Sequence, residues 1–270
     1  MAATVRTAAT VLKMRVLTAA IGIPIMLLLL YFGGMVLVIG IGVLSGLGIW
    51  ELHRMLRLHK VEFFPFAALG WVWAFIWAST HPSWTLPVLT LGSVGIALVA
   101  LLNRKPESFE GTMTTSWGAL YMGLFFSFVI RLRELSSGMT IAFSFFLIIW
   151  ATDTLAFFIG RQWGRHRLLP KISPGKTWEG TAAGTAAGIL MGMGTAYWSG
   201  LTLIDGILFG LLVSISGQMG DLLESSIKRY SGVKDSGVLL PGHGGILDRF
   251  DSVLFALPIA YYLLRGLGIS

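Results

Sequence analysis

Acidic side chains recur at helical spacing in the last fifth of an otherwise apolar chain. Asp221 and Glu224 stand three residues apart in SISGQMGDLLESSIKRY, and Asp248 and Asp251 stand three apart in ILDRFDS. If both stretches are helical, each pair falls on one helix face. Carboxylates delivered by two separate helices suit a hard cation such as Mg²⁺, which keeps waters and shares phosphate oxygens. These four residues are therefore the candidate metal ligands.

Basic side chains lie among these acids, in a segment rich in glycine at residues 225–251. Nucleotidyl transfer needs in-line geometry, metal bridging and dispersal of negative charge more than covalent help from the protein. His243 in PGHGG is either a contact to a phosphate or base, or a hydrogen-bonding strut. The candidate catalytic residues of this segment are Asp221, Lys228, Arg229, Lys234, Asp235, His243, Asp248 and Arg249.

A second polar region lies upstream. Asp153 interrupts the apolar run IIWATDTLAFFIG, where an ionisable group costs several kcal/mol unless it faces a polar cavity or a partner. It is either a functional residue or a structural hydrogen-bonding one. In residues 160–180, lysines beside glycine and serine lead into an expected helix start. That pattern fits a phosphate cradle and equally an ordinary basic loop. The candidate substrate-binding residues are Asp153, Lys171, Ser173, Lys176 and Glu179.

The composition indicates how these residues are positioned. The 270 residues are 55% hydrophobic and 12% charged, as in an integral membrane protein, and the absence of cysteine excludes disulfides and thiolate sites. Spanning a bilayer takes about 20 apolar residues per helix. We therefore expect an all-α, polytopic bundle of about nine transmembrane helices. The predicted spans are 16–33, 35–50, 63–80, 85–102, 114–130, 139–160, 180–199, 202–220 and 252–268.

The placement of the basic residues predicts the orientation. With nine alternating spans, only Arg131, Arg133 and Arg265 fall on the side opposite the N-terminus. The positive-inside rule then puts the N-terminus and the loops at 161–179 and 221–251 in the cytoplasm. The net charge of +7 thus indicates bilayer orientation and an anionic substrate rather than nucleic acid. We expect a multi-pass protein of the inner (plasma) membrane whose active site faces the cytoplasm.

The two halves of the chain differ in chemical content. Residues 1–112 hold about four spans and little ionisable chemistry, and the loop at 51–60 reads as a solvated connection. Residues 113–270 carry the catalytic candidates. In the seventh span, glycines recur every four residues, which predicts close packing against another helix. These glycines are Gly180, Gly184, Gly188 and Gly192.

The segment at 225–251 resembles the motif of the phosphatidate cytidylyltransferases, also called CDP-diacylglycerol synthases. The pattern S-x-[apolar]-K-R-x4-K-D-x-G-x3-P-x-H-G-G-[apolar]-x-D-R-[apolar]-D is matched at every fixed position. The region from Asp153 through SPGKTWEG is also similar, so the resemblance covers roughly the C-terminal half. The matched residues are Ser225, Lys228, Arg229, Lys234, Asp235, Gly237, Pro241, His243, Gly244, Gly245, Asp248, Arg249 and Asp251.

The resemblance implies that CTP and phosphatidate react to give CDP-diacylglycerol and diphosphate. It implies Asp221 and Asp248 as the principal ligands of a divalent ion, with a second, monovalent ion such as K⁺ allowed. Asp251 and Glu224 would be weaker ligands or would support them. Ser173, Lys176 and Glu179 would line the nucleotide and lipid pocket. The resemblance also implies a homodimer.

Two other functions fit parts of the pattern. A transporter for an anionic substrate also uses many helices and intramembrane carboxylates, but it predicts inverted repeats with polar sites in both halves. Here the polar residues concentrate in the second half. A cytidylyltransferase or kinase acting on a different lipid is the other alternative, because the motif carries head-group chemistry and leaves the lipid tail open.

Overall fold

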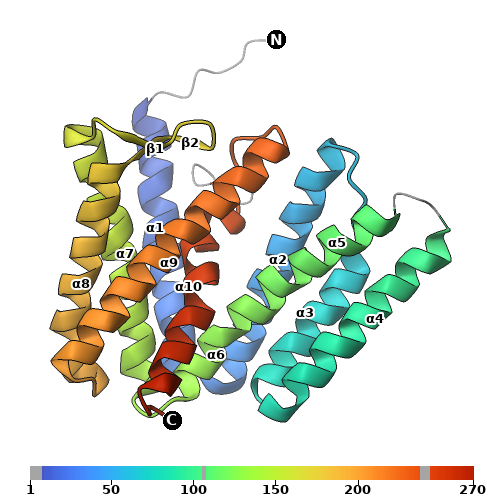
Figure 1. Ribbon diagram of the computed structural model, residues 1–270, viewed down its shortest axis with the longest axis horizontal. Helices are drawn as coiled ribbons and strands as arrows, with labels where there is room; N and C mark the ends of the chain where they lie inside the picture. The colour runs from blue at the N-terminus through green and yellow to red at the C-terminus, as the bar shows by residue number, and fades with distance from the viewer. Residues whose placement is uncertain (1–7, 105–107, 238–243) are drawn as a thin grey trace.

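The computed structural model describes residues 8–104, 108–237 and 244–270, with side chains described from residue 20 onward. Figure 1 shows a bundle of helices with a small hairpin at one end. In chain order the helices are α1 (Ala8–Phe32), α2 (Gly34–Leu58), α3 (Pro65–Ser79), the 3₁₀ turn η1 (Pro82–Trp84), α4 (Thr85–Asn103), α5 (Ser108–Ala119), the π-helical η2 (Leu120–Phe125), α6 (Phe126–Glu134), α7 (Gly138–Trp163), α8 (Trp178–Ser199), α9 (Leu203–Tyr230) and α10 (Leu247–Gly266).

A helix lies at each predicted span, because a chain in lipid must satisfy its backbone hydrogen bonds internally. The protein is a multi-pass membrane helical bundle. Within the described residues, two apolar helices, Ala20–Phe32 and Pro65–Ser79, are shorter than 18 residues. The number of nine crossings therefore stays a prediction. The segments long and apolar enough to cross a bilayer are Gly34–Leu58, Pro82–Asn103, Ser108–Glu134, Gly138–Trp163 and Leu203–Tyr230.

Regular secondary structure extends into both predicted polar loops, and at 221–251 it is the helix on which the shared face of each acid pair depends. α9 continues to Tyr230 and α10 begins at Leu247, so helix occupies both ends of the predicted loop at 221–251. The predicted loop at 161–179 contains an antiparallel hairpin of β1 (Arg167–Leu169) and β2 (Ser173–Thr177), which the all-α expectation left out. The hairpin leads directly into α8. There the side chain of Thr177 caps the helix by accepting a hydrogen bond from the Gly180 N–H at 3.1 Å.

The glycines of α8 bring its backbone against α9, as the four-residue spacing predicted. A Cβ added at Gly210 of α9 would overlap the carbonyl oxygen of Gly188 in α8. A Cβ at Gly192 would likewise overlap the carbonyl oxygen of Gly206. Only glycine allows this backbone approach. α9 is thereby fixed against α8, along the helix that carries Asp221.

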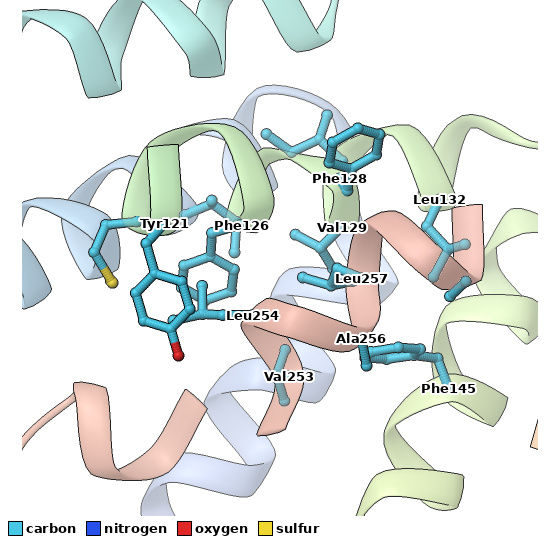
Figure 2. Close-up of a cluster of buried hydrophobic side chains, with 14 of the residues drawn as sticks. Tyr121, Phe126, Phe128, Val129, Leu132, Phe145, Val253, Leu254, Ala256 and Leu257 are labelled. Atoms are coloured by element: carbon cyan, nitrogen blue, oxygen red, sulfur yellow. The ribbon is translucent and has the colours of Figure 1, made fainter. Parts of the chain in front are cut away.

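The core also fixes the position of α10. Figure 2 shows Tyr121, Phe126 and Val129, from the η2 and α6 segment, directed toward Leu254 and Leu257 of α10, and all five side chains are fully buried. Burying a large apolar side chain favours the folded state by about 1.5–3 kcal/mol in water-soluble proteins, and in lipid the gain comes from packing contacts. This contact holds the helix that carries Asp248 and Asp251.

The two ends of the bundle differ in what they carry. In Figure 1 the hairpin and the C-terminal ends of α2 and α9 lie at the top, while the chain's C-terminus lies at the bottom. At the bottom, Arg131 donates to the carbonyl oxygen of Ala78 at 3.2 Å and Arg133 donates to that of Leu30 at 2.8 Å. Arg131 and Arg133 therefore bind the C-terminal turns of α3 and α1. The acidic residues of interest lie toward the other end.

Candidate active site

The acids of α9 and α10 meet in the structure. α9 is helical through Asp221 and Glu224, so these side chains share a face, and α10 presents Asp248 in its first turn. The buried Glu224 carboxyl lies within electrostatic reach of both Asp221 and Asp248. The central expectation from the sequence, that two helices bring Asp221 and Asp248 to one place, matches this arrangement.

Asp248 is held on both of its carboxylate oxygens. Its Oδ2 accepts hydrogen bonds from the Ser236 N–H, the Ser236 hydroxyl and the Gly245 N–H, each at 2.8 Å. Its Oδ1 lies 2.8 Å from the ammonium of Lys228. Burial alone raises the pKa of the Asp248 carboxyl, but the Gly245 hydrogen bond, Lys228 and Ser236 bring the pKa below its ordinary value. Asp248 is therefore an ionised anchor between α9, the following loop and α10.

Lys228 joins the two helices because it pairs with Glu224 one turn earlier as well as with Asp248. Its side chain is 12% exposed and that of Glu224 is 2% exposed, so both charges are withdrawn from solvent. Within the described residues, Oε1 of Glu224 is buried and has no hydrogen-bond partner. A buried carboxylate oxygen left in this state is compensated by a cation or by water.

Two further carboxylates adjoin this pair. Asp251, one turn into α10, interacts electrostatically with Asp221, Glu224 and Asp153. Asp153 in α7 is accessible at the helix surface, and its carboxyl accepts a hydrogen bond from the side chain of Ser252. The intramembrane aspartate thus has the partners that its position in an apolar run required. Three helices, α7, α9 and α10, contribute acids to one cluster.

Lys176 connects the hairpin to the cluster. Its ammonium lies 2.6 Å from Oδ2 of Asp221, and its charge also acts on Asp153, as does that of Arg249. Within the described residues these contacts involve five carboxyl groups and three basic side chains, so the carboxyl groups outnumber their basic partners. We define the carboxylate cluster as Asp153, Asp221, Glu224, Asp248 and Asp251, with Lys176, Lys228 and Arg249 as its basic partners.

The cluster has the donor chemistry of a Mg²⁺ site without a closed coordination shell. Its potential donor atoms are carboxylate oxygens, they include the unpartnered Oε1 of Glu224, and the carboxyl groups outnumber the basic side chains, all of which would suit a hard divalent cation. In the described part of the chain, no group of three or more His, Asp or Glu side chains is arranged to hold a metal ion directly. The oxygens of Asp248 accept from protein donors instead. The four-residue ligand set stays a prediction.

Several predicted site residues lie outside the cluster. Arg229 donates to the carbonyl oxygen of Ile172 at 3.2 Å, so it holds the hairpin against the end of α9. Ser173 is half-buried at the start of β2. Lys171, Lys234 and Asp235 are exposed. His243 lies outside the described residues.

Glu179 also lies outside the cluster, in the first turn of α8. Its carboxylate accepts a hydrogen bond from the ring of His166 at 2.7 Å. A hydrogen bond from its own backbone N–H and the one from His166 lower the pKa of Glu179 to about 2. The ionised side chain joins the hairpin to the start of α8.

The sequence did not predict that Glu51 and Tyr121 lie near the cluster. Glu51, expected in a solvated connection, is instead 6% exposed and accepts hydrogen bonds from the backbone N–H groups of Ile246 and Leu247. The sequence signal that could have identified Glu51 is its position directly after the apolar run of α2. Tyr121 is fully buried, with its hydroxyl 3.5 Å from the carbonyl oxygen of Asp251. Nothing in its sequence context distinguishes it from a core tyrosine.

Comparison with known proteins identifies the family of the chain. A sequence model of the cytidylyltransferase family matches residues 13–267. Phosphatidate cytidylyltransferase of Bacillus subtilis (strain 168) is 35% identical over 262 residues, covering 94% of this chain and 97% of that protein. Phosphatidate cytidylyltransferase of Staphylococcus aureus (strain COL) is 37% identical over 262 residues, covering 94% of this chain and 99% of that protein. The chain therefore belongs to the cytidylyltransferase family.

Proposed function

We propose that the protein is an enzyme that transfers the cytidylyl group of CTP to phosphatidate, giving CDP-diacylglycerol and diphosphate. The relatives with this activity in their names match the chain over nearly its whole length. The observation that carries the proposal is the carboxylate cluster with its three basic partners, built from three helices of a membrane bundle. Such a site can receive a polyphosphate from water and a phosphate from lipid.

In the proposed reaction a phosphate oxygen of phosphatidate attacks the α-phosphorus of CTP. The new phosphorus–oxygen bond forms as the bond from the α-phosphorus to the oxygen bridging the α- and β-phosphates breaks, and diphosphate leaves with that electron pair. The protein's part is to align the two phosphates and disperse negative charge. We assign this role to Lys176 and Lys228, because each ammonium lies within 2.8 Å of a cluster carboxylate.

Mg²⁺ is the cofactor that the cluster best suits. Asp221, Glu224 and Asp251 would hold it together with phosphate oxygens and water, and it would supply charge neutralisation at the reacting phosphate. Asp248 would contribute through one oxygen if Lys228 shifts toward the substrate. The second, monovalent ion allowed by the resemblance is part of the same proposal.

We place the active site at the cytoplasmic face of the inner membrane. The hairpin end of the bundle carries Lys171 and Lys176 and adjoins the basic C-terminal turn of α9, and cytoplasmic ends of membrane proteins are enriched in such residues. CTP would enter from that side. The homodimer implied by the resemblance also belongs to this proposal, and the mass of the detergent-solubilised protein measured by light scattering tests it.

The decisive experiment supplies purified protein with radiolabelled CTP, phosphatidate and Mg²⁺ and looks for label in the lipid fraction. We expect labelled CDP-diacylglycerol and an equal amount of diphosphate. Labelling of another lipid phosphate in place of phosphatidate would identify a related cytidylyltransferase. Transfer of the γ-phosphate would identify a kinase. Uptake of an anion into protein-containing liposomes without nucleotide, and without labelled lipid, would replace the proposal with a transporter.

A further inference from the structure

Glu51 supplies a helix cap from the far half of the chain. Its Oε1 accepts from the Ile246 N–H at 2.9 Å and its Oε2 accepts from the Leu247 N–H at 3.0 Å. These groups lie at the N-terminus of α10, where backbone N–H groups lack partners within the helix and a negative charge is favoured. The local N-cap residue, Ile246, provides no side-chain cap. The carboxylate of α2 therefore takes the place of a local cap.

The Ser236 hydroxyl connects this cap to Asp248. It lies 2.8 Å from Oδ2 of Asp248 and 3.3 Å from Oε2 of Glu51. Asp248 is the residue directly after Leu247, whose N–H is bound by Glu51. A shift of the Glu51 carboxylate therefore moves the start of α10, and with it the carboxylate that pairs with Lys228.

The glycines of the loop give independent evidence that the Glu51 side chain is built into this site. A Cβ added at Gly237 would lie 2.8 Å from Oε1 of Glu51. A Cβ added at Gly245 would overlap both Oε2 of Glu51 and the Ser236 hydroxyl. Because Gly237 and Gly245 have no side chain, they leave space for the Glu51 carboxylate. Glu51 lies 186 residues before Gly237 in the sequence. The motif and Glu51 form one structural unit.

We infer that Glu51 is a positioning residue for the active site: by binding the first N–H groups of α10, its carboxylate orients Asp248 toward Lys228. The inference rests on the proposed function for its activity readout, and its structural readout is independent of it. It assigns the first half of the chain a direct part in building the catalytic site. A buried glutamate that only adds stability would make the same contacts, so the test must separate positioning from stability.

The test compares Glu51→Gln with Ser144→Ala. Glutamine keeps the volume but presents an NH₂ group toward an N–H donor, so at least one cap bond is lost. Ser144→Ala removes a buried hydrogen bond to Ser199, between α7 and α8, and serves as the stability control. For Glu51→Gln we expect kcat/KM for CTP to fall about tenfold or more, the scale of one lost buried charge-assisted bond. The KM for phosphatidate should stay within about twofold in both variants, because neither substitution is at a residue that the resemblance assigns to the lipid pocket.

Hydrogen exchange supplies the structural readout. Backbone amides of Ile246 and Leu247 should exchange about tenfold faster in Glu51→Gln and at the wild-type rate in Ser144→Ala. Wild-type exchange at these amides, or equal acceleration through α7 and α8, would overturn the inference. Wild-type kcat/KM in Glu51→Gln would overturn it as well.

Failure of the proposed function and failure of the role inferred for Glu51 can be distinguished. If the wild-type protein transfers no cytidylyl group, the proposed function fails, and exchange at Ile246 and Leu247 still decides whether Glu51 positions α10. If Glu51→Gln cannot be purified in a folded state, Ser236→Ala removes the hydroxyl that links Glu51 to Asp248. It should accelerate exchange at the same amides and lower kcat/KM, and unchanged values for both would overturn the inference.

Discussion

The ammonium of Lys228 in α9 lies 2.8 Å from Oδ1 of Asp248 in α10, and the same group pairs with Glu224 one turn earlier. One cation thus compensates two carboxylates on two helices. Since Asp248 is also fixed by Ser236 and Gly245, the pair ties α9, the loop after it and α10 into one polar unit. Changes to this unit should therefore affect catalysis, and they should also affect stability where a buried charge loses its partner.

Asp248→Asn should abolish turnover in a folded protein. The amide removes the charge that pairs with Lys228. Its NH₂ group would also face a donor, either the Lys228 ammonium or the Gly245 N–H, where Asp248 presents an acceptor oxygen. We expect kcat to fall by about 100-fold or more, as for loss of a preorganised charged contact in other enzymes. Asp205→Asn, in the capping box at the opposite end of α9, is the folded control. Near wild-type turnover in Asp248→Asn would remove this residue from the site.

Lys176 and Lys171 form a matched pair on one hairpin. Lys176 lies 2.6 Å from Asp221, whereas Lys171 is exposed at the turn. Lys176→Ala should raise the KM for CTP and lower kcat/KM about tenfold or more, while Lys171→Ala should stay within about twofold, because exposed charges contribute little. Equal effects of the two changes would indicate a diffuse electrostatic role of the hairpin in place of a contact at the cluster.

Hydropathy was enough to predict the helical bundle, but it did not predict the extension of α9 or the hairpin. Apolar runs at bilayer length had to be helical, since lipid offers no partner for a free backbone group. The span that was expected to end at residue 220 continues as α9 to Tyr230 because its polar end still forms backbone helix bonds. The hairpin was missed because β1 has three residues, too few for an alternating pattern to be visible.

The residues of the site could be predicted where a local sequence pattern, such as helical spacing, marks them. Asp221 and Glu224 share a helix face by spacing, and α9 carries both to the cluster. Glu51 could not be placed, because its hydrogen-bond partners Ser236 and Ile246 lie 185 and 195 residues later, and no local pattern encodes a contact of that range. The resemblance implies that Lys234 orients phosphates or pairs with the acids; its side chain is exposed, and its role stays a prediction. Motif membership identified the right segment without fixing which side chains face inward.

Lys228→Met should destabilise the protein more than an ordinary surface change. It leaves the buried carboxylate of Glu224 without its cation, and removal of one partner of a buried ion pair costs about 3–5 kcal/mol. Thermal unfolding in detergent measures the loss. Adding Glu224→Gln to this variant should recover part of it, because the uncompensated charge is removed. No recovery would mean that Lys228 stabilises the fold through Asp248 alone.

Removal of divalent ions should stop the reaction. We expect EDTA to abolish cytidylyl transfer and Mg²⁺ to restore it, since the excess of carboxylates requires a cation before a polyphosphate can approach. Glu224→Gln should raise the Mg²⁺ concentration for half-maximal rate about tenfold or more, as for loss of a group near a bound metal. Glu110→Gln, at an exposed position of α5, is the control. Full activity in metal-free buffer would falsify the proposed role of the ion.

The orientation of the bundle can be tested with single cysteines, because the chain contains none of its own. Lys171→Cys places a thiol at the exposed hairpin turn, and Arg265→Cys places one at an exposed position in the last turn of α10. With the basic hairpin in the cytoplasm, a membrane-impermeant maleimide should label Arg265→Cys in intact cells and Lys171→Cys only in inverted vesicles. The reverse pattern would put the cluster outside, where cytoplasmic CTP cannot reach it. Labelling of both cysteines from one side would instead show that the hairpin and the last turn of α10 face the same compartment. The number of membrane crossings between Lys171 and Arg265 would then have to be even.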